Sequence, residues 1–512
     1  MQLAKSKLVS AWPRAAGVLL HPTCLAGPHG IGDFGAGARL FIDWLATAGC
    51  TWWQVLPLGP TGGGDSPYAS GAGLAGNRWL IDLQALVEAG LLRADEVQPP
   101  RFPPHRVDFP TVIGWKRDLL HRAADRLLAD RSHPWDADLY AFRAREPWVL
   151  DAALFQALRE RRDYRPWWTW EPEFRDRNAR ALAAAREAER ADVDRYIVLQ
   201  FWFDRQWREL RKYAAAKAVQ ILGDVPIYVD ADSCDTWCNR GLFQLDRHGK
   251  PTAVAGVPPD YFSEFGQLWG NPLYDWKAMA RDQYRWWGTR MARALQLYDA
   301  VRIDHFRGFA ACWSVPADAK DARGGKWEPG PGLALFTSLR KQLGALPLVA
   351  EDLGDIDQPV HDLRDAAGLP GMRILQFAFG GAADSPFLPH MHVPNSVVYT
   401  GTHDNDTTVG WWQSTPAIQA HVADYLGKPL VADVAWELIR LAMASVAHTA
   451  IVPIQDILDL GSDARLNTPG RAKDNWTWRL EPGDLTANDA KRLAALVRLY
   501  GRTPTGPAAT LQ

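Results

Sequence analysis

The chain has 512 residues, of which 47% are hydrophobic and 23% charged, and its formal net charge is −2. These proportions are typical of a globular chain with a sizeable core, and the near-neutral charge excludes the strongly basic class of nucleic-acid and anionic-membrane binders. The odd count of five cysteines indicates no disulfide framework, no apolar run approaches a membrane span, and the N-terminus lacks the apolar region of a signal peptide. We therefore expect a cytoplasmic protein with no membrane or nucleic-acid partner.

Short apolar runs recur along the chain, and we interpret eight of them as buried strands. Most are near-continuous runs of Val, Ile and Leu, which is typical of parallel strands covered on both faces. Helical patterns lie between several of them, for example at Ala38–Ala48 and Trp276–Leu297. The sequence therefore predicts one α/β domain over residues 1–512, a (β/α)8 TIM barrel. The eight runs are Gly17–Leu20, Thr51–Leu58, Val219–Val229, Ala300–Phe306, Leu346–Leu353, Met372–Phe379, Ser396–Thr402 and Ala450–Gln455.

Two connections are too long to be simple crossovers. The first, residues 60–217 after the second strand, is rich in Ala, Arg and Glu and predicts a mostly helical inserted subdomain. The second, residues 231–298 after the third strand, carries Gly, Pro and aromatic residues with little helical periodicity before Trp276, and predicts a loop-rich insertion. Insertions after barrel strands lie on the catalytic face.

Three carboxylates stand at or just past the predicted carboxyl ends of strands: Asp304, Glu351 and Asp404. Barrel enzymes place catalysis at this face, and a neutral cleft with carboxylates suits glycosidic-bond chemistry. Arg302 lies two residues before Asp304 and therefore faces the same way, where it favours the carboxylate that a nucleophile needs. Glu351 follows an apolar run, and a carboxyl group in apolar surroundings can remain protonated and act as an acid.

Each of these patterns also has a purely structural interpretation. Arg302 and Asp304 could form an ordinary ion pair, Glu351 could cap the segment that follows it, and His403 with Asp404 is too small a pair to hold a metal. Cys234 and Cys238 have the residue types of half a metal site, but no second Cys/His pair completes it. We expect no metal.

Motifs around these residues make the chain recognisable. In order they are Leu20–Thr23, Gly30–Asp33, Gly64–Tyr68, Ala75–Asn77, Pro258–Ser263, Gly266–Pro272, Arg302–Gly308, Ala350–Gly354 and Thr400–Thr408. Together they resemble the amylomaltases, the 4-α-glucanotransferases of glycoside hydrolase family 77, from about residue 17 to Trp478. The resemblance implies a barrel with inserted subdomains, neither metal nor organic cofactor, and transfer of maltodextrin or α-glucan segments to an acceptor such as glucose. It leaves the oligomeric state open.

The resemblance also implies residue roles for a two-step retaining reaction. Asp304 matches the nucleophile, Glu351 the acid/base, and Asp404 the residue that grips the sugar and distorts its ring. Tyr261 and Phe262 match a loop over the acceptor side. For each aromatic residue, core packing is the alternative. The complete set of implied sugar-binding positions is Tyr68, Asp232, Tyr261, Phe262, Trp269, Asn271, Arg302, His305 and His403.

Some features depart from the family pattern or leave other functions open. Gly63 replaces a side chain that is often aromatic, so the Gly62–Gly64 loop is expected to be flexible and to bind donor sugar weakly. An α-glucan hydrolase using the same carboxylates is the closest alternative function, since only the attacking molecule differs. A binding protein without catalysis is disfavoured because all three carboxylates are present. A phosphate-metabolite enzyme would need an anion loop, for which residues 461–470 are a weak candidate.

Overall fold

The computed structural model describes residues 12–259, 263–429 and 432–503. Eight strands form one sheet in which the paired neighbours are parallel, and each overlaps one of the eight predicted runs. In sheet order they are β10 (Gly371–Ile374), β11 (Ser396–Tyr399), β12 (Thr449–Pro453), β1 (Ala15–Leu19), β2 (Trp52–Gln54), β3 (Gln220–Pro226), β6 (Ala300–Asp304) and β9 (Leu348–Ala350).

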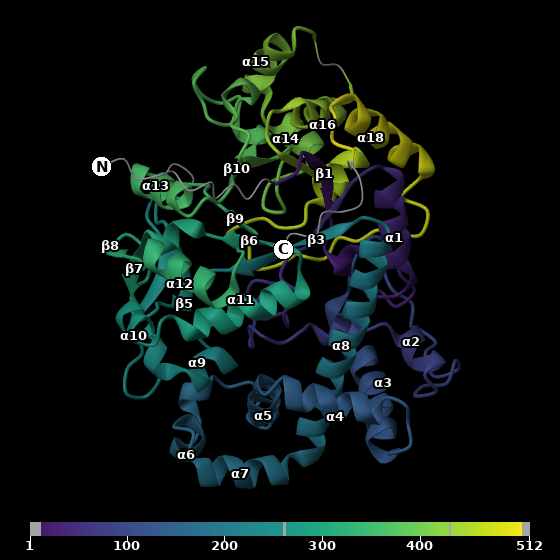
Figure 1. Cartoon of the computed structure of the whole chain (residues 1–512), viewed down its shortest axis with the longest axis vertical. Helices are drawn as coiled ribbons and strands as arrows, with labels where there is room; N and C mark the ends of the chain where they lie inside the picture. The colour runs from purple at the N-terminus through teal and green to yellow at the C-terminus, as the bar shows by residue number, and fades with distance from the viewer. Residues whose placement is uncertain (1–11, 260–262, 430–431, 504–512) are drawn as a thin grey trace.

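The two outer strands of this order meet and close the sheet. The Ala350 N–H at the end of β9 donates a 2.9 Å hydrogen bond to the carbonyl of Pro370, directly before β10. Helices lie around the sheet, as a (β/α)8 barrel requires (Figure 1). The predicted barrel fold is confirmed. The strands are shorter than the predicted runs because residues past their ends, such as Val55–Leu58 after β2, are also buried.

Helices α1 and α18 illustrate why these segments are helical. In α1 (Ala36–Thr47) the buried residues include Ala38, Phe41, Ile42 and Leu45, a helical spacing that forms one apolar face toward the core. Helix α18 (Ala487–Leu499) begins with a capping box between Thr486 and Asp489. The other helices outside the two long connections are α12 (Leu333–Leu343), α13 (Gln358–Ala366), α14 (Thr408–Ser414), α15 (Pro416–Leu426), α16 (Val434–Ala444) and α17 (Ile454–Ile457).

Seven helices occupy the connection between β2 and β3. They are α2 (Leu83–Glu88), α3 (Phe109–Ala129), α4 (Asp136–Arg145), α5 (Trp148–Glu160), α6 (Pro172–Arg175), α7 (Ala179–Ala188) and α8 (Arg190–Ala216). Helix α8 runs from this layer back to the barrel, and α3 and α5 pack against it (Figure 1). Its buried Trp202 and Trp207 contribute large apolar surfaces to the core, which stabilise the layer.

A second, antiparallel sheet forms beside the barrel. Its order is β5 (Gln267–Pro272), β4 (Ala253–Val257), β7 (Ala311–Pro316) and β8 (Lys326–Pro329). The segment 231–298 also contains α9 (Cys234–Cys238), which its sequence did not indicate. Helices α10 (Trp276–Arg281) and α11 (Arg285–Leu297) lie within the predicted helical pattern Trp276–Leu297. Strand β5 is largely exposed, and β4 pairs with β7 from another connection, so no local apolar alternation marked them.

The end of the described chain is tied to its beginning. The fully buried Arg502 side chain donates hydrogen bonds to the carbonyls of Ala15 and Met443, and Arg14 donates to the carbonyl of Tyr500. Burial lowers the pKa of Arg502 to about 9. These contacts hold the start of β1 against the segment that leads into β12. Within the described residues, no helix has both the length and the apolar character needed to cross a membrane.

Candidate active site

Most of the predicted site residues meet in one cleft at the carboxyl ends of barrel strands. The cleft has a volume of about 620 Å³, and Asp304, the last residue of β6, lines it. Residues 467–472 and the glycines 63 and 64 form parts of its rim. The predicted residues that line it are Tyr68, Trp269, Asn271, Asp304, His305, His403 and Asp404.

A buried arginine lies beneath Asp304. The Arg302 guanidinium donates to Asp304 Oδ1 at 3.0 Å and to Asp224 Oδ2 at 2.6 Å. Asp224 is opposite Arg302 in the register of β3 with β6. Burial raises the pKa of Asp224 to about 7, although the charge of Arg302 acts in the opposite direction. The cation is thus held between two carboxyl groups, and it fixes the orientation of Asp304.

Glu351 directly follows strand β9, the neighbour of β6. Ile303 pairs with Ala350, and the Glu351 N–H donates to the Ile303 carbonyl at 3.1 Å, so Glu351 lies close to the end of β6 that carries Asp304. The Glu351 Oε2 atom accepts a hydrogen bond from the His305 N–H at 2.6 Å, and Glu351 Oε1 accepts one from the Leu353 N–H at 2.9 Å. Burial raises the pKa of Glu351 to about 8, while the charge of Arg302 opposes that rise.

His305 reaches this position through an uncommon backbone conformation. Its φ is 53°, in the left-handed region that a residue other than glycine rarely occupies. The chain reverses there, directly after β6, and the His305 N–H contacts the Glu351 carboxyl group. Such conformations persist where the surroundings impose them, which is common at active sites.

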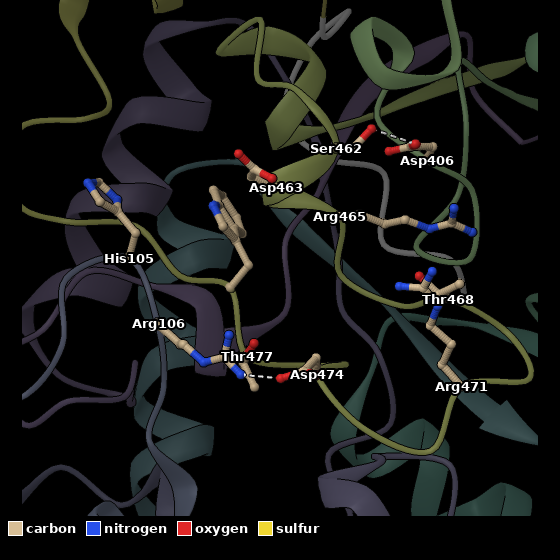
Figure 2. Close-up of a pocket in the computed structure, with 11 residues that line it drawn as sticks. His105, Arg106, Asp406, Ser462, Asp463, Arg465, Thr468, Arg471, Asp474 and Thr477 are labelled. Carbon is tan, nitrogen blue, oxygen red and sulfur yellow. Dashed lines mark hydrogen bonds and ion pairs between the residues drawn. The ribbon is translucent and has the colours of Figure 1, made fainter. Parts of the chain in front are cut away.

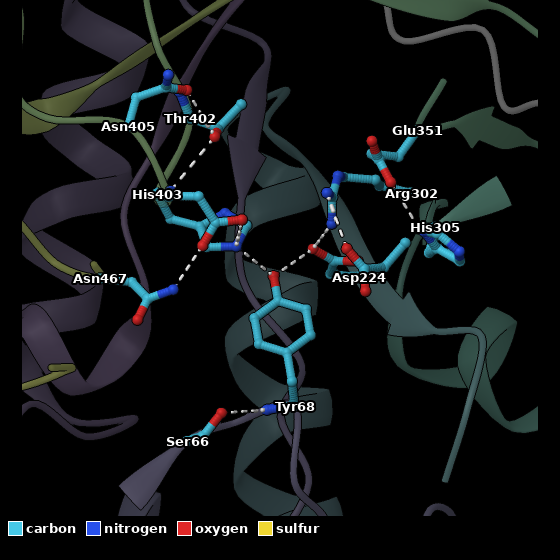
Figure 3. Close-up of polar contacts among 12 residues, drawn as sticks. Ser66, Tyr68, Asp224, Arg302, His305, Glu351, Thr402, His403, Asn405 and Asn467 are labelled. Atoms are coloured by element: carbon cyan, nitrogen blue, oxygen red, sulfur yellow. Dashed lines mark hydrogen bonds and ion pairs between the residues drawn. The ribbon is translucent and has the colours of Figure 1, made fainter. Parts of the chain in front are cut away.

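The opposite wall of the cleft is built around Tyr68. Its hydroxyl lies 2.8 Å from Asp224 Oδ2, to which it donates, and 2.9 Å from His403 Nε2 (Figure 3). The rings of Tyr68 and His403 are stacked, with centroids 5.3 Å apart. Asp404 Oδ1 accepts from Asn467 Nδ2 at 2.6 Å, while the Asp404 side chain remains 42% exposed. This wall offers carboxylate, imidazole and amide groups to a polar ligand.

Aromatic rings form the wall beyond His305. Trp269 meets His305 edge to face at 4.7 Å between centroids, and Tyr228 lies 6.3 Å from each of these two rings. Trp269 remains 37% exposed, so part of its ring is free to contact a ligand. Asn271 donates to the carbonyl of Val229 at 2.9 Å. Two further predicted residues of this side, Tyr261 and Phe262, lie outside the described residues.

Asp232 is not among the described residues that line the cleft. Its Oδ2 lies 2.9 Å from Arg159 Nη2, and its Oδ1 accepts from the Trp167 N–H at 2.9 Å. Both carboxylate oxygens are therefore engaged with the helical layer. In this structure the Asp232 carboxylate joins that layer to the connection that follows β3.

Comparison with known proteins identifies the family of the chain. A family model described as 4-alpha-glucanotransferase matches residues 20–486. The chain belongs to the 4-alpha-glucanotransferase family. It is therefore an enzyme of this type, as the motifs predict.

Relatives and a solved structure agree with the family. The chain is 48% identical to the chloroplastic/amyloplastic 4-alpha-glucanotransferase of Arabidopsis thaliana over 96% of this chain and 86% of that protein. It is 47% identical to the 4-alpha-glucanotransferase of Thermus thermophilus over 96% and 99% of the two chains. The amylomaltase from Streptococcus agalactiae in complex with acarbose superposes with a TM-score of 0.93 at 38% identity, covering 96% of this chain and 100% of that one.

Two residues that contact predicted site residues were not predicted from the sequence. Asp224 could have been found as the one charged residue in the buried strand β3. Asn467 had no such signal, because it lies in residues 461–470, which the sequence indicated only as an ordinary turn or a weak phosphate loop. The structure places Asn467 beside Asp404, so this segment belongs to the wall of the cleft.

A second hollow lies beyond that wall. It has a volume of about 450 Å³ and shares Thr468 and Arg471 with the cleft (Figure 2). Arg106 pairs with Asp474 at 2.6 Å across it. None of the three catalytic candidates is among the residues that line it.

One group among the described residues has the closeness that a metal ion needs: His29, Asp33 and Asp82. It lies beside a different groove, next to α1 and α2. The fully buried Lys116 Nζ lies 3.8 Å from Asp33 Oδ2 and donates to the carbonyl of Trp79. An ammonium group therefore already supplies the positive charge that these carboxylates require.

Proposed function

We propose that this enzyme is a retaining transferase, which moves a segment of an α-1,4-glucan to the 4-hydroxyl of glucose or a maltodextrin through a covalent glycosyl-enzyme intermediate. The observation that carries the proposal is that Asp304 ends β6 and Glu351 directly follows β9, the strand paired with β6. Neighbouring strands lie about 4.8 Å apart, which suits the carboxyl separation of about 5–5.5 Å used by retaining enzymes. An inverting enzyme needs a wider gap to hold water between its carboxyl groups.

In the first half of the reaction, Asp304 attacks the anomeric carbon while Glu351 acts as the acid. An Asp304 oxygen forms the new bond to carbon, the glycosidic C–O bond breaks, and the Glu351 proton goes to the leaving oxygen. The buried environment of Glu351 supports this role because it keeps the acid protonated near neutral pH. Arg302 supports the role of Asp304 as the nucleophile because it holds the Asp304 carboxylate in a fixed orientation.

In the second half, Glu351 acts as the base. The ionised carboxyl takes the proton from the acceptor 4-hydroxyl, the acceptor oxygen attacks the anomeric carbon, and the bond to Asp304 breaks. Between the two halves of the reaction, the donor glucose ring that is attached to Asp304 lies against Asp404, His403 and Tyr68. All three residues line the cleft, and hydrogen bonds to ring hydroxyls strengthen as the ring distorts.

Transfer rather than hydrolysis depends on the acceptor side of the cleft. Water is present at about 55 M, but well-oriented reacting groups reach effective molarities of about 10⁵–10⁸ M. Trp269 offers a partly exposed ring beside His305 on which an acceptor glucose can stack. The proposed roles of Tyr261 and Phe262 on this side rest on the sequence resemblance alone.

Incubation with maltotriose alone tests the reaction. Each transfer breaks one α-1,4 bond and makes another, so reducing ends should stay constant while glucose and maltodextrins longer than the substrate accumulate. Asp304→Asn should reduce this activity by several orders of magnitude, whereas the exposed Asp355→Asn, a matched control, should keep the normal rate. Reducing ends that rise in step with glucose, without longer products, would show a hydrolase instead.

A further inference from the structure

A pair of thiols lies behind the loop that carries Tyr68. Cys234 and Cys238 are the first and last residues of the one-turn helix α9, and their sulfur atoms are 3.6 Å apart. Positions i and i+4 of a helix face the same side, so this proximity follows from their spacing. Cys234 is buried and Cys238 is half-buried, so Cys238 is the more accessible residue of the pair. The reaction described above uses neither thiol.

A permanent positive charge contacts the more accessible sulfur. Arg177 Nη1 lies 3.1 Å from Cys238 Sγ, and its guanidinium stacks over Trp237 at 4.1 Å. Arg177 Nη2 also donates to Asp151 at 3.0 Å, which fixes the guanidinium in place. A cation in this position stabilises negative charge on a sulfur that takes part in thiol–disulfide exchange.

The helix that carries the thiols also supports the Tyr68 loop. The Cys234 N–H donates to the carbonyl of Gly71 at 2.8 Å, and the Asp235 carboxylate accepts from the Gly73 N–H at 2.7 Å. These two contacts join α9 to the residues that follow Tyr68 directly. A change in the shape of α9 therefore reaches the wall of the cleft.

We propose that Cys234 and Cys238 form a site of reversible thiol–disulfide exchange with low-molecular-weight disulfides, and that its oxidation weakens the support of the Tyr68 loop. The Cys238 thiolate attacks one sulfur of the small disulfide, forms a mixed disulfide and releases one small thiol. The Cys234 thiolate then attacks the Cys238 sulfur and releases the second. The two cysteines lose two protons and two electrons, and the small disulfide is reduced to two thiols.

Formation of the bond changes the helix. A disulfide needs Cβ atoms about 3.5–4.5 Å apart, but residues i and i+4 of a helix hold them about 5–6 Å apart. The last turn of α9 must therefore rearrange, and Cys238 is the residue that can move because it ends the helix. The Asn239 N–H, which donates to the Asp235 carbonyl at 3.1 Å, belongs to that turn. Asp235 thus links the turn that changes to the loop that carries Tyr68.

The test equilibrates the full-length protein with glutathione buffers of varying oxidised-to-reduced ratio, followed by mass spectrometry and assay on maltotriose. We expect a loss of two hydrogens in the peptide that contains both cysteines, with a rise in KM or a fall in kcat/KM of at least about fivefold that dithiothreitol reverses. Cys234→Ser should stop at a stable mixed disulfide with one glutathione on Cys238. Cys50→Ala, which removes a buried thiol elsewhere, should behave like the unmodified chain.

Two further variants separate reactivity from folding. Arg177→Met should slow glutathione attachment to Cys238 in the Cys234→Ser background, and Arg177→Lys, which keeps the charge, should restore part of the rate. Absence of the internal disulfide in all buffers would overturn the proposal. An internal disulfide that leaves kcat and KM unchanged would overturn the link to the Tyr68 loop, and since reduced protein would still be active, neither result affects the proposed transfer reaction.

Discussion

Raising the pH through the pKa of Glu351 should remove the acid that protonates the leaving group. With a pKa of about 8, the carboxyl group is mostly protonated at pH 7. Above the pKa the protonated fraction falls tenfold per pH unit, so kcat/KM for a natural donor should fall about tenfold at pH 9 and about 100-fold at pH 10. The assay uses maltoheptaose as the donor, below its KM, and labelled glucose as the acceptor, at saturating concentration. It measures the label that is incorporated into maltodextrin products.

An activated donor provides the matched control. A maltosyl fluoride releases fluoride, which needs little protonation, so its alkaline loss of kcat/KM should be much smaller over the same pH range. Glu351→Gln should likewise slow maltoheptaose far more than the fluoride. Equal alkaline losses with both donors, or a loss that is complete by pH 6, would refute the assignment of Glu351 as the acid.

The same carboxyl group should make stability depend on pH. Its pKa is raised from 4.5 to about 8 on folding, so the stability it contributes is fully present below pH 4.5 and is lost as the pH rises to about 8. The loss amounts to about 3–5 kcal/mol at order of magnitude. Glu351→Gln cannot ionise, so its Tm relative to the unmodified protein should rise between pH 5 and pH 8. A Tm difference that is the same at all pH values would contradict this.

Three further substitutions follow from the geometry of the cleft. Asp224→Asn leaves the buried Arg302 with Asp304 as its only carboxylate partner. The free energy of unfolding, measured by calorimetry, should therefore fall by about 3–5 kcal/mol, and kcat on maltotriose should fall at least about tenfold. Gly63→Tyr meets no atoms within 4 Å of its new Cβ and should lower KM for long donors by about two- to tenfold through stacking, with maltotriose little affected. Trp269→Ala should lower the ratio of transfer to hydrolysis by about tenfold, measured as longer products per new reducing end; an unchanged ratio would remove it from the acceptor side.

The barrel could be predicted from sequence because its strands are locally distinctive. A strand covered on both faces, such as β12, is apolar at nearly every position, and this signal does not depend on which strand lies next to it. The exposed strand β5 gave no such signal. Strand β5 forms by pairing with β4, which pairs with β7 on its other side. Sequence patterns do not report pairings between distant segments.

The site was predictable where a residue stands at the end of a strand or within a recognisable motif. Asp304 and Glu351 met both conditions, and the pairing of β6 with β9 brings the ends of these two strands together. Asp232 met the second only, and both of its carboxylate oxygens contact the helical layer. Asn467 met neither, because its role arises from a loop that approaches Asp404 in three dimensions.

The tie between the two ends of the chain has a consequence for how the protein is made. Strand β1 has β12 as one of its two partners, and about 430 residues separate them. At about 5–20 residues per second, a ribosome needs about 20–90 s to deliver the second strand after the first. During that interval one edge of β1 is an unpaired apolar strand, and Arg502, which holds its start, has not been synthesised. The barrel can therefore close only after β12 has been synthesised, and until then one edge of β1 lacks its partner strand.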